Sequence, residues 1–169
     1  MSYLNRVFLQ ILVEQIQMGS GYIKGFYTPI HPEKYLGDLN NIFHRSSWEL
    51  DCMKFLDNNP NVKVWLSEGF SIPYVHPYKK NKDGTAKISQ YWPDFYIEYV
   101  NKSGNMIKEV WEIKPKAQTK LSRSKNARRK LMENLIVSVN IAKWKSAKQY
   151  CDKNGIQFRV ITENILFSK

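Results

Sequence analysis

Hydrophobic residues recur with a helical period in three parts of the chain. Apolar residues spaced three or four positions apart line one face of a helix, and this spacing predicts helices over about residues 2–18, over about 47–58 and in a stretch after Pro115. Gly19-Ser20-Gly21 ends the first helix and Gly155 is a stop signal for the third. The apolar positions that define the helices are Val7, Phe8, Ile11, Leu12 and Ile16; Trp48, Cys52, Phe55 and Leu56; and Leu131, Leu135, Val139 and Ala142.

The spacing of apolar residues is no longer helical over residues 62–111, where short apolar runs are divided by turn signals. Such runs predict strands, and Lys82-Asp83-Gly84 and Lys102-Ser103-Gly104-Asn105 are typical of hairpin turns. We expect three or four largely antiparallel strands here and a last strand over residues 158–162. Two helices, a β meander, a helix and a strand indicate an α/β fold, with a mixed central sheet flanked by helices.

Residues 21–41 contain glycines, prolines and tyrosines without a regular period, which predicts an irregular but ordered loop. We expect this loop to pack onto its own domain. The alternative is that Tyr22, Phe26, Tyr27 and Tyr35 form part of a surface that meets a partner protein.

Length and composition narrow the class of protein. A chain of 169 residues is of the size of one domain, so we expect a single domain over residues 1–169. Hydrophobic residues make up 43% of it, which excludes a disordered chain, and its apolar runs are too short for a membrane helix. With no signal peptide, we expect a cytosolic protein. Cys52 and Cys151 read as reduced, buried thiols, and the three histidines lack zinc-ligand spacing.

The positive charge is concentrated in the C-terminal part of the chain. Residues 1–100 hold ten Lys or Arg and ten Asp or Glu, whereas residues 101–169 hold sixteen and five, so the whole net charge of +11 lies there. Between Ile113 and Met132 there are eight basic residues and no acid, a density that attracts nucleic acid; a solvated helix face is the alternative. The eight are Lys114, Lys116, Lys120, Arg123, Lys125, Arg128, Arg129 and Lys130.

Two short motifs in the meander carry candidate chemistry. Pro93-Asp94 opens one expected strand, and Glu112-Ile113-Lys114 closes the next. Side chains alternate along a strand, so Glu112 and Lys114 share a face, and Asp94 lies next to Glu112 if the strands pair across the turn at 102–105. Two carboxylates suit Mg²⁺, and an adjacent lysine orients water or stabilises charge on a phosphate, which indicates a phosphodiester hydrolase. The alternative is an exposed Glu-x-Lys pair of no catalytic role.

Two further acids lie upstream. Glu49 follows Ser46 by three residues, so it is either a third metal-site carboxylate, a partner in a capping box at the start of the 47–58 helix, or both. Glu68 is a further ligand, a partner for Lys63 or Arg45, or an exposed charge.

Taken together, these motifs resemble the PD-(D/E)XK nucleases and, more narrowly, the head completion nucleases of T-even-type tailed phages. The resemblance covers about residues 22–166 and leaves residues 1–21 as an accessory helical element. The matching segments are Tyr27-Thr28-Pro29, Pro32-Glu33-Lys34-Tyr35-Leu36-Gly37, Arg45-Ser46-Ser47-Trp48-Glu49, Trp65-Leu66-Ser67-Glu68, Ile72-Pro73-Tyr74, Tyr91-Trp92-Pro93-Asp94-Phe95 and Glu112-Ile113-Lys114-Pro115-Lys116.

The resemblance implies a restriction-endonuclease-like core and DNA cleavage that depends on Mg²⁺, with Mn²⁺ as the alternative, linked to closing the filled head before tail joining. It implies that Asp94 and Glu112 bind the metal, that Lys114 is the catalytic lysine, and that Glu49 matches the helix acid of transposon end-cutting nucleases. Gln118 falls where some relatives carry a glutamine, although a polar residue at a helix start explains it equally well.

We therefore expect a double-stranded DNA nuclease of little base specificity, with phosphate contacts from a helix that begins near Lys120. Its further partners would be phage head, portal or neck proteins, and its place the host cytoplasm during virion assembly or the virion. The alternatives are a non-catalytic DNA-end-binding neck protein and a junction-resolvase or transposon-type endonuclease. The expected DNA contacts are Lys116, Lys120, Arg123, Lys125, Arg128, Arg129 and Lys130.

Overall fold

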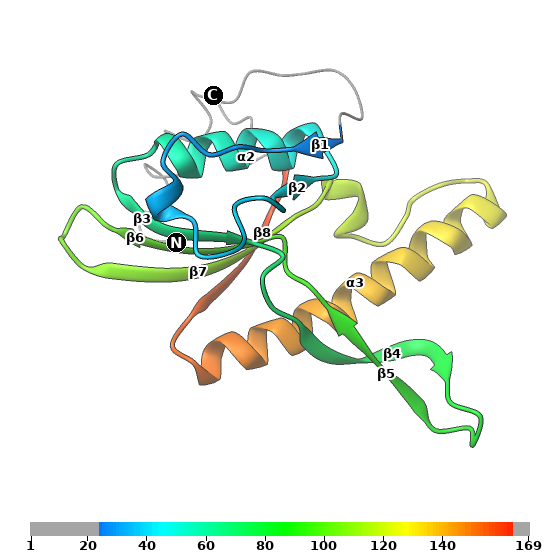
Figure 1. Cartoon of the computed structure of the whole chain (residues 1–169). Helices are drawn as coiled ribbons and strands as arrows, with labels where there is room; N and C mark the ends of the chain where they lie inside the picture. The colour runs from blue at the N-terminus through cyan, green and yellow to red at the C-terminus, as the bar shows by residue number, and fades with distance from the viewer. Residues whose placement is uncertain (1–23, 164–169) are drawn as a thin grey trace.

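The computed structural model describes residues 24–163, and its centre is a four-stranded mixed sheet (Figure 1). The sheet has the order β3-β6-β7-β8; β3 pairs antiparallel with β6 and β6 with β7, whereas β8 is parallel to β7. This confirms the expected mixed central sheet. The strands are β3 (Val62–Ser67), β6 (Phe95–Val100), β7 (Met106–Ile113) and β8 (Gln157–Ile161).

Helices cover both faces of this sheet, α2 (Ser47–Asn58) on one and α3 (Ala127–Lys153) on the other (Figure 1). The α2 face carries the larger apolar core, in which Met53 and Leu56 pack with Trp65 and Trp111, all fully buried. The α2 boundaries match those predicted from the apolar spacing and from Pro60, because local signals fix both ends: Ser46 caps the start and Pro60 follows the end.

The expected single meander is wrong in one respect, because two of its strands leave the central sheet. Strands β4 (Ile72–Lys80) and β5 (Ala86–Tyr91) form a separate antiparallel hairpin (Figure 1), so β3 pairs with β6 and skips the hairpin. The hairpin buries its own apolar face against α3 through Ile72, Tyr74 and Tyr91. The expected count of three or four strands over residues 62–111 is also wrong, because five form there; the apolar runs did not predict β5, nor the surface that the hairpin covers.

The loop before α2 packs onto the domain, as expected. It contains β1 (Gly25–Phe26), the 3₁₀ turn η1 (Pro32–Lys34) and β2 (Phe43–His44). Tyr35 meets the ring of Trp65 edge-on at 4.6 Å, and the Tyr27 hydroxyl donates to Asp57 Oδ2 at 2.7 Å. Phe26, in contrast, is 69% exposed. Tyr22 lies outside the described residues.

The predicted start of the third helix, near Lys120, is wrong. The chain after Pro115 forms the 3₁₀ turn η2 (Lys116–Gln118) and then an irregular segment, and α3 begins at Ala127. Serine and asparagine side chains bond the backbone in this segment: Ser122 Oγ accepts from Ser124 N at 3.1 Å, and Asn126 Oδ1 accepts from Arg129 N at 2.9 Å as the helix cap. Such local bonds compete with helix formation and explain the later start.

The end of α3 is as expected, because Gly155 adopts a φ of +68° that most residues avoid and the chain then enters β8. Both cysteines are buried and unpaired by disulfides. Within residues 24–163 no helix is long and apolar enough to cross a membrane. The predicted helix over residues 2–18 lies outside the described residues.

Asp57 anchors the loop before α2 and gives a test of the fold. Its fully buried carboxylate accepts from the Tyr27 hydroxyl and from the backbone N–H groups of Ile30 and His31, at 2.6 to 2.9 Å. Asp57→Ala leaves these donors without an acceptor, so we expect the free energy of unfolding to fall by about 2–4 kcal/mol in urea denaturation. Asp57→Asn keeps one acceptor and should cost less. A loss below about 0.5 kcal/mol for Asp57→Ala would contradict this anchoring role.

Candidate active site

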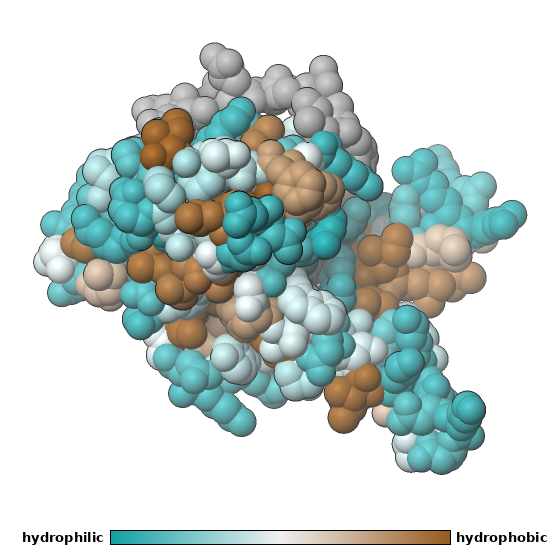
Figure 2. Space-filling view, in the orientation of Figure 1, coloured by the Kyte–Doolittle hydropathy of each residue, from teal (hydrophilic) through white to brown (hydrophobic). Residues whose placement is uncertain are grey.

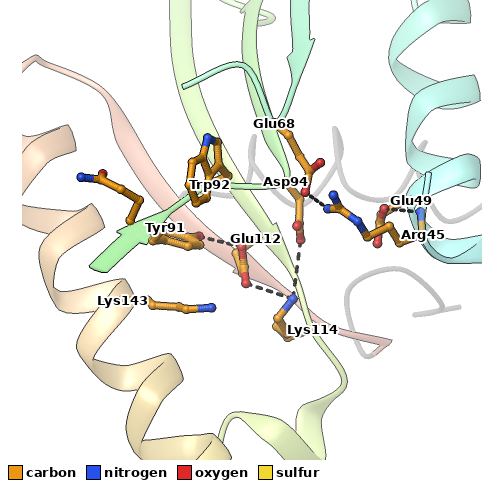
Figure 3. Close-up of a pocket in the computed structure, with 10 residues that line it drawn as sticks. Arg45, Glu49, Glu68, Tyr91, Trp92, Asp94, Glu112, Lys114 and Lys143 are labelled. Atoms are coloured by element: carbon orange, nitrogen blue, oxygen red, sulfur yellow. Dashed lines mark hydrogen bonds and ion pairs between the residues drawn. The ribbon is translucent and has the colours of Figure 1, made fainter. Parts of the chain in front are cut away.

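Pairing of β6 with β7 brings Asp94, Glu112 and Lys114 together at one end of the central sheet (Figure 3). The register pairs Phe95 with Trp111, so Asp94, just before β6, lies beside Glu112 near the end of β7. The Lys114 ammonium is 3.0 Å from Glu112 Oε1 and 3.9 Å from Asp94 Oδ2. The two carboxylates therefore face one amine, as the alternation along the strands predicted.

Backbone bonds hold the group in place. Asp94 Oδ2 accepts from the N–H of Ile113 at 2.6 Å, which ties the two strand ends together. The N–H of Lys114 donates to the carbonyl of Ile161 in β8 at 2.9 Å, so the residue after β7 is still fixed by its parallel neighbour. The position of the three side chains is thus set by the sheet rather than by a loop.

Burial makes this group electrostatically unfavourable without a further cation. The side chain of Glu112 is 2% exposed and that of Asp94 14%. Burial, and next the charge of Glu112, raise the pKa of Asp94 to about 8. Burial acts to lower the pKa of Lys114, because it disfavours the charged ammonium. The carboxylates of Asp94 and Glu112 favour the ammonium more strongly, so the pKa of Lys114 is raised. One ammonium does not balance two buried carboxylates, and such a donor set fits a hard divalent cation.

Tyr91 and Lys143 belong to the same site, and the motifs did not identify either as functional. The Tyr91 hydroxyl donates to Glu112 Oε2 at 2.6 Å, so both oxygens of that carboxylate have a partner. Burial and the charge of Glu112 raise the pKa of Tyr91, which therefore stays a donor. Lys143, on α3, has its ammonium 5.5 Å from the centre of the Tyr91 ring. Tyr91 stands three residues before Asp94, whereas no sequence signal distinguishes Lys143 from the other lysines of α3.

Glu49 lies at the same pocket but is engaged in the cap of α2. Ser46 Oγ accepts from Glu49 N at 3.2 Å and donates to Glu49 Oε1 at 2.9 Å, while Glu49 Oε2 accepts from the N–H of Arg45 at 2.8 Å. The capping interaction is confirmed, and the backbone N–H group that bonds the Glu49 carboxylate is that of Arg45. Within residues 24–163 no three His, Cys, Asp or Glu side chains are grouped closely enough to hold a metal. A ligand role for Glu49 stays a prediction.

Glu68 forms an ion pair with Arg45 at the rim of the pocket, one of the alternatives given for it (Figure 3). Its φ of +46° is in the left-handed region, and its N–H donates to the Asp94 carbonyl at 3.2 Å. A non-glycine residue in this region is a local strain that functional sites often retain. Gln118 ends η2 and does not line the pocket.

The pocket is a cavity of about 490 Å³ between the start of α2, the end of β5 and the middle of α3. Its lining is mostly charged, which suits a polyanionic ligand bound through a cation better than an apolar one. The lining residues are Arg45, Glu49, Glu68, Gln90, Tyr91, Trp92, Asp94, Glu112, Lys114 and Lys143.

The predicted DNA-contact residues are all exposed but do not lie on one helix. Lys116 is in η2, Lys120, Arg123 and Lys125 are in the irregular segment, and only Arg128, Arg129 and Lys130 are in the first turn of α3. Arg129 also pairs with Glu133 at 2.7 Å.

Comparisons with known proteins agree with this geometry. The family model described as TnsA-like endonuclease N terminal matches residues 59–163, well over half of the chain, including Asp94, Glu112 and Lys114. The chain therefore belongs to the TnsA-like endonuclease family and is a deoxyribonuclease with a restriction-endonuclease-like fold. It is also 36% identical to the Head completion nuclease of Enterobacteria phage T4 over 146 residues. This alignment covers 83% of the chain and 91% of the phage T4 protein. No solved structure shows a significant match.

The raised pKa of Asp94 makes a prediction about stability. Its pKa is about 8 in the folded protein and near 3.8 when unfolded, so wild-type stability falls as the pH rises from about 4 to 8. Asp94→Asn removes this cost, so at pH 8 in chelator we expect the variant to gain about 1 kcal/mol, or roughly 2–4 °C in thermal unfolding. At pH 4 the gain should disappear. The exposed control Asp152→Asn should show no such pH dependence; a lower midpoint for Asp94→Asn at pH 8 would contradict the burial argument.

Proposed function

We propose that this deoxyribonuclease is Mg²⁺-dependent and hydrolyses phosphodiester bonds of double-stranded DNA with little base specificity, at the pocket of Asp94, Glu112 and Lys114. The observation that carries the proposal is the buried carboxylate pair facing a single ammonium, with Glu112 Oε1 3.0 Å from Lys114 Nζ. The pair lies in a polar pocket that is open to solvent, where a phosphate can reach it.

Asp94 and Glu112 would hold the cation, because hard divalent ions take one or two carboxylates and fill the rest of their sphere with water and phosphate oxygens. When bound, Mg²⁺ polarises the phosphodiester and favours ionisation of the attacking water. Mn²⁺ suits the same donors. Glu49, in the first turn of α2, would add negative charge near the cation or bind it through a water molecule.

The remaining chemistry belongs to the chain's own side chains. Lys114 would orient the attacking water or offset charge that develops on the phosphate, since its ammonium keeps its proton beside Glu112 and Asp94. Tyr91 would keep Glu112 in a fixed orientation through its 2.6 Å hydrogen bond to Oε2. Glu49 lines the same pocket as Asp94 and Lys114, which supports a place for it in the same site.

Contacts to the DNA backbone would come from the exposed basic residues that follow β7. Lysine and arginine contacts to phosphates position a duplex without reading its sequence, which is why we propose little base specificity. The residues are Lys116, Lys120, Arg123, Lys125, Arg128, Arg129 and Lys130.

We place this activity in phage head completion, because the T4 relative carries the name Head completion nuclease and the match spans 91% of it. The enzyme would trim or cut DNA at the filled head before the tail joins, in the host cytoplasm during virion assembly, in contact with head, portal or neck proteins. The exposed Phe26 side chain is a candidate for such a contact.

Replacement of the carboxylates tests the catalytic part of the proposal. Asp94→Asn and Glu112→Gln should lower Mg²⁺-dependent nicking of supercoiled plasmid at least 100-fold, because the cation loses a charged ligand, while duplex binding in chelator changes less than about threefold. Lys114→Met should also lose activity. Glu98→Gln, on β6 but outside the pocket, is the matched control and should cut normally.

Unchanged cleavage in purified Asp94→Asn or Glu112→Gln would refute the catalytic assignment. Duplex binding without cleavage, with either Mg²⁺ or Mn²⁺, would instead favour a non-catalytic DNA-end-binding protein. A strong preference for a four-way junction over a linear duplex would favour a resolvase-type enzyme.

A further inference from the structure

We propose that the hairpin of β4 and β5 is a second DNA-contacting element, a β-ribbon that holds the duplex beside the active-site pocket. The inference rests on the proposed function, that the pocket acts on double-stranded DNA, and adds a contact surface outside the basic residues that follow β7. The sequence motifs gave no indication of it, because the hairpin was expected to lie within the central sheet.

The charge of the hairpin fits a polyanion. Lys79, Lys80, Lys82 and Lys87 are exposed around its tip, and Asp83 is the one acid over residues 72–91. That acid is used locally, since its carboxylate accepts from the N–H and the hydroxyl of Thr85 in the turn, at 2.9 and 2.6 Å. Figure 2 shows hydrophilic residues gathered at this tip, which extends from the body at the lower right.

Two apolar side chains are exposed on the outer face of the hairpin. Val75 and Ile88 are cross-strand partners and are 57% and 65% exposed. A two-stranded ribbon fits the major groove of B-DNA, where its lysines reach the phosphates and short apolar side chains contact base edges. The same two apolar residues would also suit a protein partner, but the lysines around them favour DNA.

The pairing of β4 with β5 is irregular near the tip. The register shifts between Val75 and Lys80, and His76 Nδ1 accepts from the backbone N–H groups of Tyr78 and Lys79 at 3.2 and 3.1 Å. His76 therefore holds the backbone of this irregular stretch, from which the side chains of Tyr78 and Lys79 are exposed.

The base of the hairpin is a wall of the active-site pocket. Gln90, which pairs with Pro73, lines that pocket. Tyr91 and the half-exposed Trp92 line it too (Figure 3). The inner face is fixed on α3, where Tyr74 and Tyr91 are buried. Because the base of the hairpin borders the pocket, a duplex whose phosphate enters the pocket lies close to this ribbon. In Figure 1 the hairpin and the first turns of α3 both extend away from the central sheet.

The test is removal of the tip charge with a matched control. The variant is Lys79→Gln/Lys80→Gln/Lys82→Gln/Lys87→Gln, and the control removes four exposed lysines elsewhere, Lys54→Gln/Lys63→Gln/Lys102→Gln/Lys153→Gln. Binding of a fluorescent 30-base-pair duplex is measured by anisotropy in chelator at several salt concentrations. We expect the tip variant to bind at least tenfold more weakly, and the slope of its log affinity against log salt concentration to be smaller by about 2–3. The affinity of the control should change less than threefold.

A second variant tests the outer face. Ile88→Glu places a negative charge on the exposed face, and because this side chain is on the surface, the thermal midpoint should not change. We expect this variant to bind the duplex at least tenfold more weakly. If it binds as tightly as the wild-type protein, the outer face of the ribbon does not lie in a DNA groove.

Equal weakening in the tip variant and its control, or none in either, would overturn the inference while leaving the nuclease proposal untouched. Failure of the wild-type protein to nick plasmid with Mg²⁺ or Mn²⁺ would instead refute the proposed function. The anisotropy measurement would still report on the hairpin, because it needs no catalysis.

Discussion

The arrangement at this site depends on one constraint, which is that two carboxylates of like charge are kept buried beside a single ammonium. Without a bound cation, burial and the charge of Glu112 raise the pKa of Asp94 to about 8, so its carboxyl group keeps its proton at neutral pH. The group persists because the strands around it are fixed: Ile113 N bonds Asp94, and the Tyr91 hydroxyl bonds Glu112. Stabilisation from the rest of the fold offsets the local cost, and a cation can then be bound by ligands that are already in place.

The two faces of the central sheet differ in what they carry. The α2 side carries the large aromatic and aliphatic core, with Trp65 and Trp111 fully buried, and this burial stabilises the sheet. The α3 side carries Glu112, Tyr91 and Lys143, and the hairpin that borders the pocket. Because the pocket lies at the end of the sheet between these layers, its residues come from elements far apart in the chain but each element is anchored in a core.

The differences between sequence and structure follow from what each pattern encodes. The ends of α2 were predicted because Ser46 and Pro60 are local signals. The late start of α3 was missed because Ser122 and Asn126 bond nearby backbone groups, a competition that apolar periodicity does not register. The departure of the hairpin depends on the surface of α3, formed by residues about 50 to 75 positions later in the chain.

The sequence by itself determined the order of α2, the central strands, α3 and β8, the location of the basic segment and the neighbourhood of Asp94, Glu112 and Lys114. It could do so because strand alternation and a short hairpin turn are local properties. Only the tertiary structure decided that Tyr91 and Lys143 join the site and that the β4–β5 hairpin stands apart from the sheet. These depend on which faces pack together, and that choice is made by burial across the whole chain rather than by any one segment.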